Sequence, residues 1–493
     1  MEKKHIIVGS ILVIGAIMVG SSLAWWTWST SSNEQTNVVV TIGGTTISYE
    51  DGEDITNNNL IPTSTKEQGI SKDITISSTS TVYLDLNMTV VALDDGLKDA
   101  SFKYEIYNGS DLVTGGNFAS SNVNDIINLL SGIEITSTPV IYTLYIWIDG
   151  NMDNPNTMYN QDFELRLSAN ATDEKPPITG EELGDQIASK SNGVKDTVTD
   201  IATTDEGIWE TQDDYGTTYY FRGAVENNYV KFADYYWRIV RINGDGSIRL
   251  IYDGTSAHAN GESSDDRQIG TSAFNSNSDD NAYVGYMYGT PGSSTYEETH
   301  ANTNNSTIKT VVDNWYKTNI VDKGYSEKVA DVIYCNDRSI SAYKPSSGYN
   351  NLGYGTNITA YRWRYAPWST NVNDVTMRCP QLSQDGMSTS NATKGNKALT
   401  YPVGLITMDE VVCGGGYNGS NNSYYLYTGQ YYWTMSPYEF NGINAGVRAV
   451  LSFGSVDNSS NVVNTDGVRP VISLKSSVEL TGNGTMEDPY VVQ

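Results

Sequence analysis

The stretch VYLDLNMTV, residues 82–90, alternates apolar side chains with Tyr, Asp, Asn and Thr at every position. This period of two is typical of a β-strand that buries one face. Similar alternation occurs over residues 102–106, 142–148 and 163–167, and Asp-Gly and Gly-Gly pairs suited to hairpin turns occur in the same region. Several such strands predict an all-β sandwich domain over residues 38–172.

Residues 173–214 differ from this pattern. Lys175-Pro176-Pro177 marks an extended break, and residues 181–201 have helical character without a strong apolar face. These features predict a linker with a short helix, so the chain is expected to be multidomain.

Residues 215–493 predict an α+β domain. The turn sequence Asn243-Gly244-Asp245-Gly246 separates two alternating runs, residues 236–242 and 248–252, which predicts a hairpin. Apolar residues at 308, 311, 312, 315 and 316 fall on one helical face, with Asn305 or Ser306 in the capping position. Closing strands are expected over residues 431–435, 447–453 and 468–474.

The composition restricts the partners of the protein. Its 493 residues include 30 Lys and Arg against 58 Asp and Glu, which gives a formal net charge of −28. Such an acidic chain repels phosphate backbones, so nucleic acid is not an expected partner. The 35 Tyr and 10 Trp against 8 Phe favour aromatic rings at surfaces, because Tyr tolerates water at its hydroxyl end.

The N-terminal segment predicts export. Two lysines precede an uncharged apolar run over residues 6–24, with small residues at Ser22 and Ala24. Residues 1–24 therefore read as a signal peptide cleaved after Ala24 or as an uncleaved membrane anchor, and both interpretations stay open. Either one places the rest of the chain outside the cell or on its surface, with membrane contact only through this segment.

Motifs in the second domain resemble a known family. YWRIV (236–240), STIK (306–309) with Trp315, VGLITMDEV (403–411), YWTMSP (432–437) and GVRPV (467–471) follow one another in this order. The set resembles a family of bacterial secreted domains of unknown function, although Lys309 stands where that family often has Arg. It is also similar, more distantly, to C-type-lectin-like folds, including formylglycine-generating enzymes. The resemblance implies a fold and assigns no catalytic residue.

The first domain resembles TasA/camelysin-type biofilm matrix proteins. The sequence AWWTWS (24–29) and the alternating strands after it carry this likeness. The resemblance implies self-association into fibres.

Few residues suit catalysis or metal binding. His258 and His300 lie in a polar region and are expected to be exposed loop residues, and the chain has no G-x-S-x-G motif. Cys335, Cys379 and Cys413 have spacings that fit no zinc pattern. Outside the cytosol one disulfide is expected among them, and the three possible pairings stay open.

Two acidic groups have plain structural explanations. Residues 149–154 (DGNMDN) predict a hairpin loop, with a weak calcium site as the alternative. Asp409 and Glu410 predict the first turn of a helix after Thr407. Adjacent helical residues point about 100° apart, so the two do not form a glycosidase pair. No metal or cofactor is predicted.

A tyrosine-rich segment is the candidate binding site. Its aromatic side chains lie among Gly, Asn and Ser, a composition that adaptable binding loops use to hold ligands such as sugars. The alternative is that the rings pack in the core and on sheet faces. The candidate ligand-binding residues are Tyr417, Tyr424, Tyr425, Tyr427, Tyr431 and Trp433.

These patterns predict a non-enzymatic bacterial surface or secreted protein that binds a carbohydrate or protein ligand. One alternative is a structural subunit of an extracellular matrix or fibre, which self-association would build. A second alternative is a secreted carbohydrate-active hydrolase.

Overall fold

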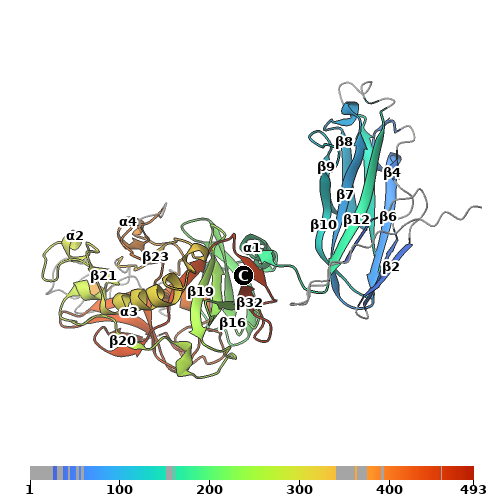
Figure 1. Cartoon of the computed structure of the whole chain (residues 1–493). Coiled ribbons are helices and arrows are strands. Elements are labelled where there is room, and N and C mark those ends of the chain that lie inside the picture. The colour runs from blue at the N-terminus through green and yellow to red at the C-terminus, as the bar shows by residue number, and fades with distance from the viewer. Residues whose placement is uncertain are drawn as a thin grey trace, which may run out of the picture. The chain divides into compact units, whose positions relative to one another are not determined.

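The computed structural model describes residues 26–29, 37–42, 45–50, 55–56, 60–151, 158, 161–339, 361–362, 375–389, 394–456 and 458–493. The predicted signal or anchor over residues 1–24 lies outside these ranges. The chain divides into two compact units, Met1–Pro176 and Pro177–Gln493 (Figure 1), and each unit has its own hydrophobic core. In the described part of the chain no helix is long and apolar enough to cross a membrane.

The first unit consists of two sheets packed around one core, in a sandwich-like arrangement that confirms its β-rich prediction. One sheet has the order β1-β12-β7-β10, with β4 beside β12, and the other has the order β2-β3-β6-β11-β8-β9, with β5 beside β11. The strands are β1 (Trp26–Ser29), β2 (Asn37–Ile42), β3 (Thr45–Glu50), β4 (Ile55–Thr56), β5 (Pro62–Thr63), β6 (Ile70–Ser78), β7 (Val82–Leu93), β8 (Phe102–Asn108), β9 (Asp111–Asn117), β10 (Ile126–Ile135), β11 (Val140–Asp149) and β12 (Phe163–Thr172).

Strand β7 contains the alternating stretch. It pairs with β12 on one side and β10 on the other, so it is a central strand. Over residues 82–90 the alternate apolar residues are fully buried and the residues between them are partly exposed, as the period of two predicts. The buried set is Val82, Leu84, Leu86, Met88 and Val90.

Most of the predicted linker belongs to the second unit. Helix α1 (Gly180–Ala188) begins at Thr179 with a capping box and packs Leu183 and Ile187 into the core. Three strands of the same region join the sheet of that unit: β13 (Ile178–Thr179), β14 (Ser191–Val194) and β15 (Asp205–Gln212). The linker prediction over residues 173–214 is wrong there because these strands are short or half-exposed, which leaves no clear hydrophobic period.

The described part of the second unit has a large sheet, a smaller sheet and two sheets of two strands each, β21-β22 and β23-β25. The large sheet has the order β13-β31-β32-β17-β18-β16-β15-β14, with β19 between β18 and β30, and the smaller one has the order β20-β29-β26-β27-β28, with β24 beside β26. The remaining strands are β16 (Thr217–Gly223), β17 (Tyr229–Phe232), β18 (Tyr235–Ile242), β19 (Ile248–Gly254), β20 (Thr271–Ala273), β21 (Met287–Tyr288), β22 (Asn304–Asn305), β23 (Tyr334–Cys335), β24 (Tyr361–Arg362), β25 (Gly386–Met387), β26 (Tyr432–Phe440), β27 (Ala445–Val450), β28 (Asn458–Asn461), β29 (Thr465–Gly467), β30 (Val471–Leu474), β31 (Glu479–Thr481) and β32 (Tyr490–Val492).

Short helices accompany these sheets. They are α2 (Tyr296–Thr299), α3 (Thr307–Tyr316), α4 (Leu382–Asp385) and α5 (Met408–Cys413). The predicted helix is α3, which begins at Ser306, whose side chain accepts a hydrogen bond from the Lys309 amide at 3.2 Å. It contacts β20 of the smaller sheet (Figure 1). The predicted hairpin joins β18 and β19, and Gly246 has the positive φ that its turn requires.

Candidate functional site

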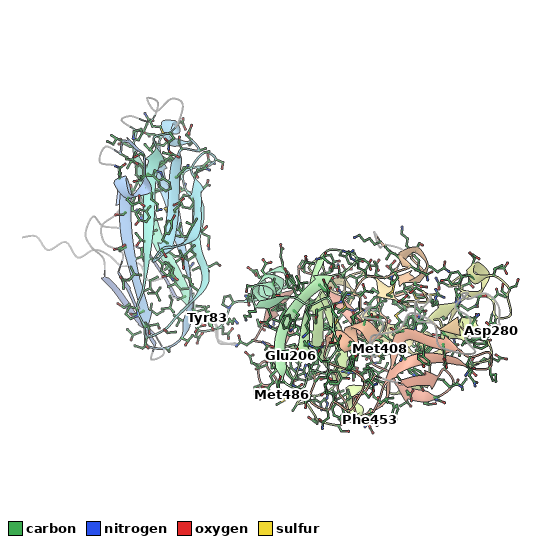
Figure 2. All side chains as sticks on the ribbon, turned by 180° about the vertical axis from the view of Figure 1, so that it is seen from behind. Tyr83, Glu206, Asp280, Met408, Phe453 and Met486 are labelled. Carbon is green, nitrogen blue, oxygen red and sulfur yellow. A yellow bond between two sulfur atoms is a disulfide. The ribbon has the colours of Figure 1, made fainter. Side chains whose placement is uncertain are left out.

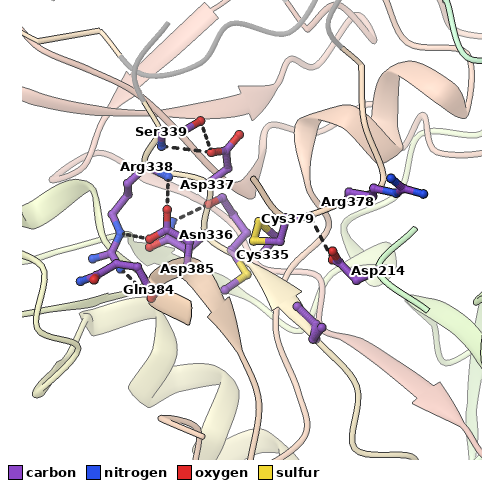
Figure 3. The surroundings of a disulfide bond; sticks show 12 residues. Asp214, Cys335, Asn336, Asp337, Arg338, Ser339, Arg378, Cys379, Gln384 and Asp385 are labelled. Atoms are coloured by element: carbon purple, nitrogen blue, oxygen red, sulfur yellow. Dashed lines mark hydrogen bonds and ion pairs between the residues drawn. A yellow bond between two sulfur atoms is a disulfide. The ribbon is translucent and has the colours of Figure 1, made fainter. Parts of the chain in front are cut away.

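A pocket in the second unit lies beside a disulfide bond between Cys335 and Cys379. Figure 3 shows the surroundings of this bond. The pocket lies where the β15–β16 turn, the β18–β19 hairpin, α5 and the disulfide meet. Its cavity volume of about 30 Å³ exceeds the roughly 10–15 Å³ that one ordered water molecule requires. Its charged lining residues are Asp213, Asp214, Arg241, Arg249, Asp337, Arg378, Asp409 and Glu410.

Helix α5 places one carboxylate at the base of the pocket. Thr407 and Glu410 form a capping box, which confirms that the acids after Thr407 belong to the first helical turn. Met408, the first residue of α5, is fully buried and fixes this end of the helix in the core (Figure 2). The Glu410 side chain is therefore held by its own helix before it contacts any other element.

Two arginines from the β18–β19 hairpin bind this carboxylate. The Glu410 Oε1 atom lies 3.1 Å from Arg241 Nε and 2.5 Å from Arg249 Nε, and all three residues are buried. Burial alone would raise the pKa of Glu410, but Arg249 and Arg241 outweigh it and lower that pKa. Glu410 is thus an ionised structural anchor.

Asp213 completes the base of the pocket. Its Oδ2 accepts hydrogen bonds from Arg241 Nη1 at 2.6 Å and from the Gly244 amide at 3.0 Å. Its Oδ1 accepts from the amides of Tyr215 and Gly216 at 2.7 and 3.0 Å. All the charges at the base are consequently paired within the protein.

The wall of the pocket carries three further carboxylates. Asp214 Oδ2 accepts from the Cys379 amide at 2.9 Å (Figure 3), and burial raises the pKa of Asp214. Asp409 accepts from the amide of Thr376 at 3.1 Å, and Asp337 accepts from the amide of Ser339 at 3.0 Å. The wall is therefore rich in carboxylate oxygens that accept hydrogen bonds from backbone amides.

The disulfide selects one of the three pairings that the sequence left open. Cys335 pairs with Cys379, and Cys413 is a buried free thiol in α5. Burial raises the pKa of the Cys413 thiol, so it stays protonated and unreactive. Close to the disulfide, the fully buried Arg338 Nε lies 2.7 Å from Asp385 Oδ1 (Figure 3).

The predicted aromatic binding surface is largely part of the core. Tyr424, Tyr425 and Trp433 are completely buried, and the Trp433 Nε1 donates to the Ser272 carbonyl at 2.8 Å. The prediction that these three bind a ligand is wrong, because their side chains are completely buried.

The other candidate rings are more accessible. Tyr417 and Tyr427 are partly buried, and Tyr431 is 43% exposed. Phe453 is a further exposed ring, in the turn after β27. None of these four residues lines the pocket.

The two histidines are buried, which corrects the prediction of exposed loop residues. His258 Nδ1 lies 2.8 Å from Glu262 Oε1 and its Nε2 lies 3.0 Å from Asp266 Oδ2. These contacts offset the cost of burying the His258 ring and connect the residues of the loop that contains it. His300 packs against Tyr296, and burial lowers the pKa of its imidazole.

The first residue of the candidate calcium loop, Asp149, pairs with a lysine. Asp149 Oδ2 lies 2.7 Å from Lys103 Nζ, so a lysine occupies the place where a cation would bind. Residues 152–154 of this loop lie outside the described ranges. In the part of the chain that is described, no three His, Cys, Asp or Glu residues are grouped so that they could hold a metal ion.

Sequence reasoning missed the buried arginines. Arg238 of the YWRIV motif donates from Nε to Asn228 Oδ1 at 2.7 Å, and Arg469 of the GVRPV motif donates from Nη2 to Asp253 Oδ1 at 2.7 Å. Both arginines are fully buried. The available signal was an arginine inside an otherwise apolar run, which requires an internal partner.

No protein-family model matches the chain, and no curated protein is significantly similar to it. The family resemblances of the two domains therefore stay predictions.

Proposed function

We propose that the chain is an extracellular or cell-surface protein that binds a ligand, without catalysis, through the pocket beside the disulfide. The observation that carries this proposal is an acid-rich pocket built on a rigid base. The base is a closed network of paired groups, and the lining above it includes Asp214, Asp337 and Asp409. A rigid base with polar groups above it is the arrangement that preorganised binding sites use.

The same network argues against a glycoside hydrolase centred on Glu410. A hydrolase of that kind needs one carboxyl group with a raised pKa as general acid. Glu410 and Asp213 do not supply this group, because the pKa of Glu410 is lowered by two arginines and Asp213 is bonded to an arginine and three amides. Asp214 lies outside this exclusion, because its pKa is raised. A C-type-lectin-like fold for the second unit stays a prediction that is compatible with ligand binding.

An array of glycans and extracellular matrix proteins, probed with the purified full chain, tests the proposal. We expect saturable binding that D409N weakens and that E297Q leaves unchanged, because Glu297 is an exposed acid on α2 outside the pocket. If the folded protein binds nothing on the array, the proposal is overturned. Binding that survives D409N, D214N and D337N would place the site elsewhere.

A structural subunit of a fibre is the second candidate, and the strand order of the first unit favours it. Each sheet has an even number of antiparallel strands along its path, so its two outermost strands run in opposite directions. A second copy placed by translation would therefore extend both sheets in the antiparallel sense.

The outermost strands β9 and β10 pair with irregular register but lack two other usual protections of an edge, namely basic residues and proline. They contain no Lys, Arg or Pro, and they expose Leu112, Val113 and Ile126. β9 and β10 lie at one side of the unit and β2 at the other (Figure 1). Concentration-dependent filaments in the electron microscope would support this candidate. I126K, at a side chain that is 68% exposed, should prevent them, and I443K in the second unit is the control.

A further inference from the structure

The two cysteines of the disulfide differ in exposure. Cys335 is partly exposed and lines the pocket. Cys379 is 5% exposed and is not part of the lining. The pocket is open to solvent, since its lining includes the exposed Arg378 and the partly exposed Asp214. A small solute that enters the pocket therefore contacts Cys335 and is kept away from Cys379.

Hydrogen bonds hold Cys335 in place without the disulfide. This residue lies in β23 and pairs with Gly386 of β25. The next residue, Asn336, donates from its amide to the Asp385 carbonyl at 3.0 Å and from Nδ2 to the Met435 carbonyl at 2.8 Å. If the S–S bond opens, Cys335 consequently keeps its position.

Cys379 is also held by contacts that do not involve the disulfide. Its amide donates to Asp214 Oδ2 at 2.9 Å (Figure 3), and Met377, two residues earlier, forms a β-bridge with Asp213. The Cα atoms of Cys335 and Cys379 are 5.6 Å apart, a separation that a disulfide spans. The two sulfur atoms therefore stay close enough to pair again after the bond opens.

We propose that this disulfide exchanges reversibly with low-molecular-weight thiols, and that Cys335 is the residue to which the thiol becomes attached. A thiolate attacks the sulfur atom that it can reach. It forms a new S–S bond with Cys335 Sγ while the bond to Cys379 Sγ breaks. The electron pair of the broken bond goes to Cys379 Sγ, which takes up a proton from water. In the reverse step the Cys379 thiolate attacks Cys335 Sγ and expels the thiol.

Cys413 provides an internal control for this exchange. It is a buried free thiol, and burial raises its pKa, so it does not attack the disulfide. Its reaction with N-ethylmaleimide requires the protein to open. The rate of that reaction therefore measures how often the surroundings of Cys413 unfold.

Treatment of the purified full chain with 2-mercaptoethanol tests the proposal. Samples are quenched with acid at intervals, free thiols are alkylated in denaturant, and the peptides are identified by mass spectrometry. We expect the disulfide to open at least about tenfold faster than Cys413 reacts with N-ethylmaleimide in a parallel native sample, because exchange through the pocket needs no unfolding. The mixed disulfide should be on Cys335, with Cys379 as the free thiol.

The variants C379S and C335S are a matched pair that each keep one cysteine of the bridge. Both are treated with 2-hydroxyethyl disulfide, the oxidised form of the same reagent. Cys335 in C379S should acquire the mercaptoethanol group at least about tenfold faster than Cys379 in C335S, because only Cys335 lines the pocket.

Opening of the disulfide that is no faster than the reaction of Cys413 would overturn the proposal, because exchange would then depend on unfolding. A mixed disulfide on Cys379 would overturn the assignment of the attacked sulfur. If Cys413 is reactive in a variant, that variant is misfolded, and the kinetics and peptides of the wild type decide.

Reversibility is measured on the reduced wild type. Replacement of 2-mercaptoethanol by 2-hydroxyethyl disulfide should restore the Cys335–Cys379 bond while Cys413 stays protected. A protein that does not re-form this bond, or that pairs Cys413 instead, would contradict the reversible exchange.

Discussion

Arg241 Nε lies 3.1 Å from Glu410 Oε1, although 169 residues separate the two along the chain. Both side chains are buried, and the contact joins strand β18 to helix α5 at the base of the pocket. The hairpin and the helix therefore hold the pocket in shape through one shared carboxylate.

Glu410→Gln removes the negative charge between two buried guanidinium groups. We expect a loss of about 3–5 kcal/mol in the free energy of unfolding, because Arg241 and Arg249 then lack their common counter-charge. Urea unfolding followed by tryptophan fluorescence measures this loss. E297Q, which changes an exposed acid, is the matched control. A loss as small as that of the control would show that the network does not stabilise the fold.

Asp385 gives stability a pH dependence of unusual sign. Burial is the main cause that raises the pKa of Asp385 from 3.8 to about 6, with Arg338 acting against it. Its contribution is then fully present below the unfolded pKa of 3.8 and is lost as the pH rises through about 6.

The comparison of wild type with D385N isolates this contribution. The stability of the wild type relative to D385N should increase as the pH is lowered from about 7 to about 5. Urea midpoints at the two pH values check it. A difference that is constant with pH would contradict the raised pKa.

The disulfide should contribute about 4 kcal/mol to the free energy of unfolding, since it closes a loop over a sequence separation of 44 residues. The double variant C335S/C379S removes it, and C413S is the control because Cys413 is unpaired. We also expect Cys413 to react with a thiol reagent only after unfolding. Fast reaction in the native protein would contradict its burial.

Substitutions of Trp433 and Tyr431 should differ in their effect on the free energy of unfolding. Trp433→Ala leaves a cavity in the core and should cost about 3–5 kcal/mol of unfolding free energy. Tyr431→Ala, two residues away, should cost much less because this residue is 43% exposed and leaves no closed cavity. Thermal and urea unfolding of the two variants measure the contrast, and equal losses would place Tyr431 in the core as well.

Features that depend on neighbouring residues could be predicted from the sequence. The alternation over residues 82–90 predicted β7, and the turn after Ile242 predicted the β18–β19 hairpin. The cap at Ser306 and the apolar face after it predicted α3. In each case the residues that carry the sequence pattern are the residues that form the element, or lie next to them in the chain.

The pocket could not be predicted, because its residues meet only in the folded chain. Asp214 bonds to the amide of Cys379 across 165 residues, and no local pattern selects this partner among 58 acidic residues. The aromatic segment was misleading for a related reason. Tyr and Trp occur both in cores and on binding surfaces, so the composition around Trp433 did not distinguish them.

The strand register at the edge of the first unit has a mechanical consequence. Trp26, at the start of β1, pairs with Ala171, next to the last residue of β12, so the chain enters and leaves this strand pair at the same end. Tension applied along the chain therefore acts at one end of the β1–β12 pair and breaks its hydrogen bonds one after another. It does not load all of these hydrogen bonds at once. We expect such tension to detach β1 from β12 while β12 stays paired with β7.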